Sequence, residues 1–168
     1  MAHVNHNSGN NEWYTPIEII KAARSAMGAI DLDPASCEKA NLIVCATRYF
    51  DQEINGLEQK WFGRVWLNPP YSRGLIQKFA NKVVESYASG DIEQACVLVN
   101  NASETGWYGK LMAECRAVCM FRSRIRFLNS SLQPKGKPLQ GQHVLYFGMS
   151  LERFADSFSS LGHILKVM

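Results

Sequence analysis

The sequence has no long hydrophobic run, and this absence limits the class of protein. None of its apolar stretches approaches the ~18–20 residues that a membrane-spanning helix needs. Its first residues, MAHVNHNSGNNE, lack the basic start and apolar core of a secretory signal. We therefore expect a soluble, cytoplasmic protein with no membrane partner.

The cysteines form no recognisable framework. There are five of them, an odd number with no repeated spacing. Cys115 and Cys119 could share one face of a turn, but no second pair or nearby histidine completes a zinc set. We expect reduced thiols and no metal site. The five are Cys37, Cys45, Cys96, Cys115 and Cys119.

Acidic residues are absent between Glu114 and Glu152. The remaining chain carries 12 of the 18 cationic residues and all 15 acidic ones, a net charge of −3. A basic span on a slightly acidic body indicates a polyanionic partner, although charge alone fits a solvated basic face equally well. The six cations in the span are Arg116, Arg122, Arg124, Arg126, Lys135 and Lys137.

Composition and periodicity predict the domain and its fold class. Residues 1–11 are polar and rich in Asn, so we expect a flexible tail followed by a single domain over residues 12–168. Strand and helix patterns alternate along that domain. This alternation predicts an α/β fold, a three-layer Rossmann-like arrangement with a mostly parallel central sheet.

Individual elements follow from the local patterns. Thr15 is the expected N-cap of a first helix, with Pro16 at its first position and Gly28 at its end. Further helices are expected over 74–90, 104–115 and 151–167, and strands are expected in the following stretches: AIDLDPAS, RVWL, EQACVLVNN, AVCMFRSRIRFL and HVLYFGM. In such folds ligands bind at the carboxyl ends of the strands.

The RVWL strand ends in Asn68-Pro69-Pro70-Tyr71, a sequence with a definite chemical use. An exocyclic amino group is a poor nucleophile because its lone pair is delocalised. Two acceptors, here the Asn68 amide oxygen and the Pro69 carbonyl, would draw the nitrogen toward a tetrahedral geometry. The prolines hold these acceptors rigidly, and Tyr71 offers a face on which an unstacked base can rest. The alternative is a stiff Pro-Pro turn with a packing tyrosine.

With these residues the chain resembles the phage-type DNA N6-adenine methyltransferases. The resemblance extends over roughly residues 12–150 and includes the stretches EWYTP, IDLDPAS, NGLEQKW, GRVWLNPPYS, RIRFL and YFG. It implies a Rossmann-like enzyme of a bacterial or phage-infected host cell that uses S-adenosylmethionine to methylate adenine in double-stranded DNA. The catalytic loop would be Asn68 to Tyr71. Since the donor is a cationic sulfonium and its leaving group is neutral, no metal is required.

The resemblance also implies a cofactor site. Tyr14-Thr15-Pro16 matches a segment that holds the methionine part of the cofactor, although a helix cap alone would explain Thr15 and Pro16. Asp33-Pro34-Ala35-Ser36 matches the opening of the cofactor motif. Asp33 would receive the ammonium group of the methionine moiety, and its alternative role is an N-cap for the next helix. Asn55 lies where relatives contact the cofactor adenine.

Two features depart from the pattern of amino-methyltransferases at large. Ser36-Cys37-Glu38 stands where a Gly-x-Gly loop usually follows, so the methionine carboxylate needs other donors, such as Thr15 or Ser36. The 28 residues from Cys37 to Arg64 are few for the usual elements, so the carboxylate that holds the ribose is left open between Asp51 and Glu53.

The basic segment at about 116–142 is the predicted DNA-contacting region. Two other functions stay open at this point. One is methylation of a protein glutamine, whose side-chain amide presents the same pair of N–H groups; the other is a catalytically inactive nucleic-acid-binding module. The expected DNA contacts are Arg73, Arg122, Arg124, Arg126, Lys135 and Lys137.

Overall fold

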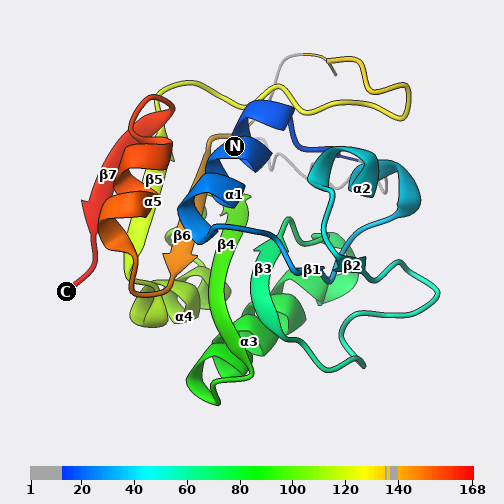
Figure 1. Cartoon of the computed structure of the whole chain (residues 1–168), viewed down its shortest axis with the longest axis horizontal. Helices are drawn as coiled ribbons and strands as arrows, with labels where there is room; N and C mark the ends of the chain where they lie inside the picture. The colour runs from blue at the N-terminus through cyan, green and yellow to red at the C-terminus, as the bar shows by residue number, and fades with distance from the viewer. Residues whose placement is uncertain (1–12, 135, 137–139) are drawn as a thin grey trace, which may run out of the picture.

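The computed structural model describes residues 13–134, 136 and 140–168. These residues form one seven-stranded sheet with helices on both faces (Figure 1). The elements in chain order are α1 (Ile17–Met27), β1 (Leu32–Asp33), α2 (Glu38–Val44), β2 (Arg48–Tyr49), β3 (Gly63–Leu67), the 3-10 turn η1 (Ser72–Gly74), α3 (Leu75–Ala88), β4 (Ile92–Asn100), α4 (Gly106–Glu114), β5 (Ala117–Phe121), β6 (Gln142–Phe147), α5 (Leu151–Phe158) and β7 (Gly162–Lys166).

The sheet has the order β2-β1-β3-β4-β6-β5-β7 and is divided into two halves. The four strands from β2 to β4 pair in parallel, whereas β6, β5 and β7 join by antiparallel pairing. The prediction of an α/β fold is confirmed. The mostly parallel sheet is a correct prediction only for the first half, because β6 pairs antiparallel with both β4 and β5, and β7 pairs antiparallel with β5.

Two apolar clusters hold the layers together. α1 and α5 pack on the face that carries Trp66 and Tyr146, while α3 and α4 pack on the face that carries Leu67 and Phe147. The helices therefore lie on opposite sides of the strands, as Figure 1 shows. Because side chains alternate along a strand, β3 places Trp66 in one cluster and Val65 and Leu67 in the other.

The end of α1 agrees with the sequence, but its start does not. Gly28 follows the helix with φ at 90°, a conformation that favours glycine. The helix begins at Ile17, so Pro16 and not Thr15 occupies the cap position, and no side chain caps it. The predicted capping role of Thr15 is wrong because its hydroxyl is engaged elsewhere, by Asn68.

The predicted final helix ends at Phe158, and its second half is a strand. β7 pairs along β5, with Gly162 opposite Phe121. A Cβ on Gly162 would lie 2.5 Å from both the Cys119 sulfur and the Met120 carbonyl oxygen, so glycine permits this close approach. The prediction of a helix after Phe158 is wrong because the spacing of apolar residues in a short edge strand can resemble that of a helix.

An ion pair fixes β1 beside β3. The Arg64 guanidinium donates to both carboxylate oxygens of Asp31, at 2.7 and 2.9 Å, and the Arg64 backbone N–H donates to the same carboxylate at 2.9 Å. Asp31 in turn donates its own backbone N–H to the Arg64 carbonyl. The hydrogen bond from Arg64 lowers the pKa of the Asp31 carboxyl. This contact joins the starts of the two strands, directly before the pairing of Leu32 with Val65.

The loop between β2 and β3 is held against the end of β1. Its Gly56 lies so close to Pro34 that a Cβ would stand 1.9 Å from the Pro34 carbonyl oxygen. Trp61 donates its indole N–H to the Gly56 carbonyl at 2.7 Å, and Lys82 of α3 donates to the Leu57 carbonyl at 2.8 Å. The turn at Asn55-Gly56 is therefore packed against the strand end.

No helix among the described residues is long and apolar enough to cross a membrane.

Glycine-to-alanine changes test this packing. Gly56→Ala is expected to lower the free energy of unfolding by about 2–3 kcal/mol, because backbone atoms must shift to admit the methyl group. Gly109→Ala, in the exposed interior of α4, is the matched control and is expected to stabilise by about 0.5–1 kcal/mol. Chemical denaturation measures both. Equal effects of the two changes would contradict the close contact at Gly56.

Candidate active site at the strand ends

The parallel half of the sheet brings the predicted motifs to one edge. β1, β3 and β4 all end there. Asp33 is the last residue of β1, Asn100 is the last residue of β4, and Asn68 directly follows β3. Leu32 pairs with Val65, and Leu67 pairs with Val97, so the three strand ends are neighbours. This edge is where ligands bind in open α/β sheets.

Asp33 is a buried carboxyl group, 3% exposed. Burial raises the pKa of this carboxyl to about 7, although hydrogen bonds from the Ser36 side chain and the Ala35 backbone N–H act in the opposite direction. Its alternative role as an N-cap is wrong, because Cys37 caps α2 by accepting from the Ala40 N–H. A buried carboxylate without a cationic neighbour is costly, so this position suits a cationic ligand.

Asn68 follows β3 and its amide is held in one orientation. Nδ2 donates to the Trp13 carbonyl oxygen at 3.1 Å and to the Thr15 hydroxyl oxygen at 3.3 Å. Both acceptors belong to the segment that precedes α1. The side-chain oxygen of Asn68 is thereby left as its acceptor, as the predicted role of this residue requires.

Tyr71 is anchored by its hydroxyl group. The backbone N–H of Asn100, at the end of β4, donates to the Tyr71 oxygen at 2.6 Å, and burial raises the pKa of the Tyr71 hydroxyl. The ring meets Trp107 of α4 edge to face, with centroids 6.0 Å apart. Tyr71 is therefore a fixed part of the site, which the motif alone did not indicate. Pro69 beside it is buried and Pro70 is partly buried.

The predicted cofactor segment Tyr14-Thr15-Pro16 is buried beside the catalytic loop. Tyr14 and Leu128 exchange two backbone hydrogen bonds, of 3.1 and 2.8 Å, in a single antiparallel bridge. The Tyr14 hydroxyl also accepts from the Cys37 thiol at 3.8 Å. The segment thus lies between the motif that follows β1 and the chain that follows β5.

The two remaining cofactor predictions fall in the loop after β2. Asn55 has φ at 56° and bonds within its own loop, to Glu58 and the Leu57 N–H. Asp51 accepts from the backbone N–H groups of Glu53 and Ile54. Asp51 lies two residues beyond β2, the strand next to β1, which is the usual place of a ribose-binding carboxylate in such sheets.

The described basic residues after β5 have different surroundings. Arg122 donates to the Ser159 and Ser160 carbonyls at 2.9 and 3.2 Å, so it caps the end of α5. Arg124 and Arg126 are exposed, and alternate with the buried residues Ile125 and Phe127. For Arg73, only the backbone, in η1, is described; Lys135 and Lys137 lie outside the described residues.

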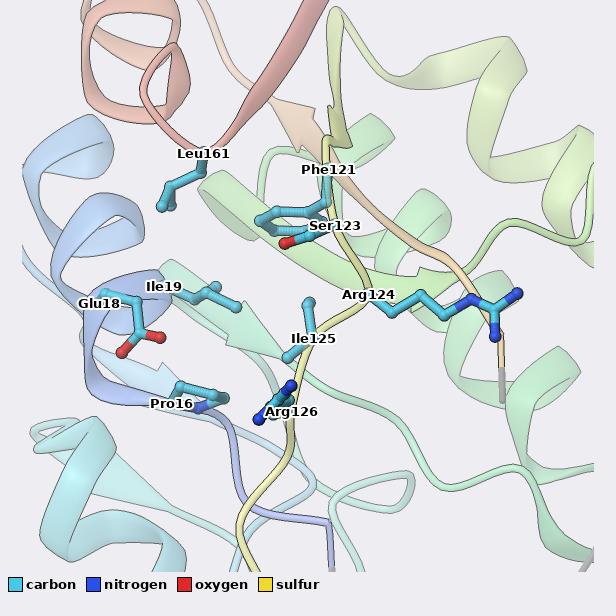
Figure 2. A pocket seen from close by; sticks show the side chains of 9 residues that line it. All are labelled: Pro16, Glu18, Ile19, Phe121, Ser123, Arg124, Ile125, Arg126 and Leu161. Atoms are coloured by element: carbon cyan, nitrogen blue, oxygen red, sulfur yellow. The ribbon is translucent and has the colours of Figure 1, made fainter. Parts of the chain in front are cut away.

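A hollow of about 610 Å³ lies between the start of α1 and the segment after β5. Figure 2 shows the Arg124 side chain extending away from Glu18 and Ile19, on the other side of the segment that follows β5. Neither Asp33 nor Asn68 belongs to its lining, so it is separate from the strand-end site, with Pro16 at the border. The lining residues are Pro16, Glu18, Ile19, Phe121, Ser123, Arg124, Ile125, Arg126 and Leu161.

Within the described part of the chain, no group of three or more His, Cys, Asp or Glu side chains is placed to hold a metal ion.

Sequence reasoning missed three residues that shape the site. Trp13 supplies a carbonyl to Asn68, Asn100 holds Tyr71, and Trp107 packs on the Tyr71 ring. No local signal could have found them, because two of the contacts are made by backbone atoms and all three join segments distant in sequence. A polar residue at the end of a predicted parallel strand was the only hint at Asn100.

The fold is that of a mixed α/β protein whose strand ends bring together a buried carboxyl group, Asp33, and a partly buried amide, Asn68. The sequence model of one family, DNA N-6-adenine-methyltransferase (Dam), matches residues 3–160. Because the match includes nearly the whole sequence, the chain belongs to this family, and the resemblance found at the sequence level is confirmed.

A relative from Escherichia phage T1 bears the name DNA N-6-adenine-methyltransferase. It is 36% identical to this chain over 99 residues, which are 57% of this chain and 38% of the relative. The chain therefore aligns with well under half of that protein's length.

The carboxyl group of Asp33 makes a testable contribution to stability. In the folded protein the pKa of this carboxyl group is about 7, whereas in the unfolded chain it has its ordinary value of 3.8. The stabilisation is therefore full below pH 3.8 and is lost as the pH rises to about 7. Relative to Asp33→Asn, the wild-type protein should lose roughly 2 kcal/mol of unfolding free energy between pH 5 and pH 8.

Denaturation curves at several pH values measure this difference. The comparison with Asp33→Asn cancels the contributions of other carboxyl groups, such as Asp31, whose pKa is lowered. Parallel stability profiles for the two proteins would show that the Asp33 pKa is not raised.

Proposed function

We propose that this protein is a DNA adenine methyltransferase that transfers a methyl group from S-adenosylmethionine to the N6 amino group of adenine. Membership of the Dam family carries the reaction class. The assignment of Asn68 as a catalytic residue rests on the orientation of its amide. Both of its N–H groups donate within the protein, to the Trp13 carbonyl and the Thr15 hydroxyl. A Rossmann-like methyltransferase core is the finer fold assignment that accompanies this function.

The residues at the end of β1 fit the cofactor. S-adenosylmethionine supplies an electrophilic methyl group on a cationic sulfonium centre, and its methionine part carries an ammonium group. The buried carboxylate of Asp33 would bind that ammonium. The positive charge would stabilise the ionised form of Asp33, which burial disfavours. Pro34 to Ser36, Tyr14 to Pro16 and Asn55 would form the walls, and Asp51 would hold the ribose.

The Asn68 loop would activate the amino group of the adenine. Asn68 Oδ1 and the Pro69 carbonyl accept its two hydrogen bonds, so electron density at N6 is held out of the ring plane. Pro69 and Pro70 restrict the loop, and the hydrogen bond from the Asn100 N–H keeps the Tyr71 ring in place to stack on the base. These groups are arranged before substrate arrives, which lowers the cost of reaching the transition state.

Double-stranded DNA is the proposed substrate. An adenine inside a duplex hides its amino group, so the base must leave the stack at a cost of a few kcal/mol. Phosphate contacts from the basic segment offset part of that cost. Arg124 and Arg126, held by the buried side chains of Ile125 and Phe127, are the described cations best placed for such contacts, and Arg73, Lys135 and Lys137 are proposed to join them.

Tritiated S-adenosylmethionine tests the reaction. Incubation with duplex DNA, followed by hydrolysis to nucleosides, should place the label in 6-methyladenine. Asn68→Ala should reduce transfer at least 100-fold, because it removes a preorganised acceptor, while the cofactor dissociation constant measured by calorimetry changes little. Label found in protein glutamine, or cofactor binding with no transfer by the wild-type protein, would refute the proposal.

The proposed role of the basic segment in DNA binding can be tested by substitution. Arg126→Gln should weaken DNA binding evenly across sequences and lower the slope of log affinity against log salt by about 1, without loss of stability. Arg122→Gln is the comparison: it removes the cap of α5 and should lower the free energy of unfolding by about 1 kcal/mol. Fluorescence anisotropy and chemical denaturation measure the two effects. An unchanged salt slope for Arg126→Gln would exclude a phosphate contact there.

A further inference from the structure

The amide of Asn68 donates both of its hydrogen bonds to one short segment. The acceptors are the Trp13 carbonyl oxygen at 3.1 Å and the Thr15 hydroxyl oxygen at 3.3 Å. An amide nitrogen has two N–H donors, so both are occupied and the oxygen is the only hydrogen-bonding group left for a substrate.

The opposite orientation of the amide would be unproductive. It would bring Oδ1 against the Trp13 carbonyl, placing two acceptors together, and would turn the Nδ2 donors toward an amino group that itself donates. Thr15 is 5% exposed, so water has little access to replace the lost hydrogen bond. The orientation of the amide therefore depends on the two acceptors of this segment.

The segment is itself held from the other side. Tyr14, between the two acceptor residues, is buried and pairs with Leu128 through two backbone hydrogen bonds. The Trp13 ring meets Phe127 edge to face, with centroids 5.9 Å apart. The chain that follows β5 thus supports the acceptors, and the acceptors support Asn68.

We propose that Thr15, together with the main-chain carbonyl of Trp13, is a positioning residue that orients the Asn68 amide for catalysis. This inference rests on the proposed function, because the orientation matters only if Asn68 Oδ1 accepts from the substrate amino group. The Thr15 hydroxyl accepts from Asn68 and keeps its own proton to donate. A single side chain therefore joins the cofactor segment to the catalytic loop.

Thr15→Val tests the role, since it preserves the shape of the side chain and removes the acceptor. With duplex DNA and saturating S-adenosylmethionine, the single-turnover rate constant should fall about tenfold, because the amide loses one of its two anchors. Thr15→Ser, which keeps a hydroxyl group, should stay within about threefold of the wild type. Thr47→Val, at an exposed position before β2, is the matched control and should leave the rate unchanged.

Saturation with cofactor separates this role from cofactor binding alone. A Thr15→Val protein that binds S-adenosylmethionine more weakly but reaches the wild-type rate at saturation would overturn the proposal. The side-chain NH₂ signals of Asn68 in ¹⁵N spectra, assigned by their loss in Asn68→Ala, give a second readout without DNA. They should show faster hydrogen exchange in Thr15→Val than in Thr15→Ser; unchanged exchange would also overturn it.

The two proposals fail in different ways. If the wild-type protein transfers no methyl group to DNA, the proposed function is wrong whatever Thr15 does. If the wild-type protein methylates adenine and Thr15→Val does so at the same rate, only the positioning role of Thr15 is wrong.

Discussion

The pairing of β1 with β3 is the contact on which the rest of the site depends. Asp31 and Arg64 bind each other through a bidentate ion pair and through backbone hydrogen bonds, where the two strands begin. Because the strands are parallel and adjacent, Asp33 and Asn68 emerge at the same edge. A different register would separate the carboxylate proposed to bind the cofactor from the amide proposed to bind the substrate amino group.

The polar groups at the strand ends differ in their effect on stability. The carboxyl of Asp33 is buried without a cationic partner among the described residues, so its ionised form destabilises the folded protein at neutral pH. Such an arrangement is typical of a group that binds a cationic ligand. Asn68 and Tyr71, by contrast, have partners in the protein already, and their geometry is set before any ligand binds.

Part of the fold was predictable from local patterns. α3 and β4 show clear periodicity, and Gly28 ends α1 as expected. The predictions that failed were those in which tertiary contacts override local preference. Thr15 has the pattern of a helix cap, yet its hydroxyl is held by Asn68; the chain after Phe158 has apolar residues at helical spacing, yet it completes the sheet beside β5.

The sequence by itself determined the chemical groups: an amide and two prolines after an apolar strand, a carboxylate after another, and a basic span without acidic residues. These signals are local, because strand ends and turns are encoded by a few adjacent residues. Only the tertiary structure decided how the groups meet. The Asn68 amide is oriented by residues more than 50 positions away, and Tyr71 is held by the end of β4. Hydrogen bonds to backbone atoms leave no mark in the sequence, since every residue carries the same carbonyl and N–H groups.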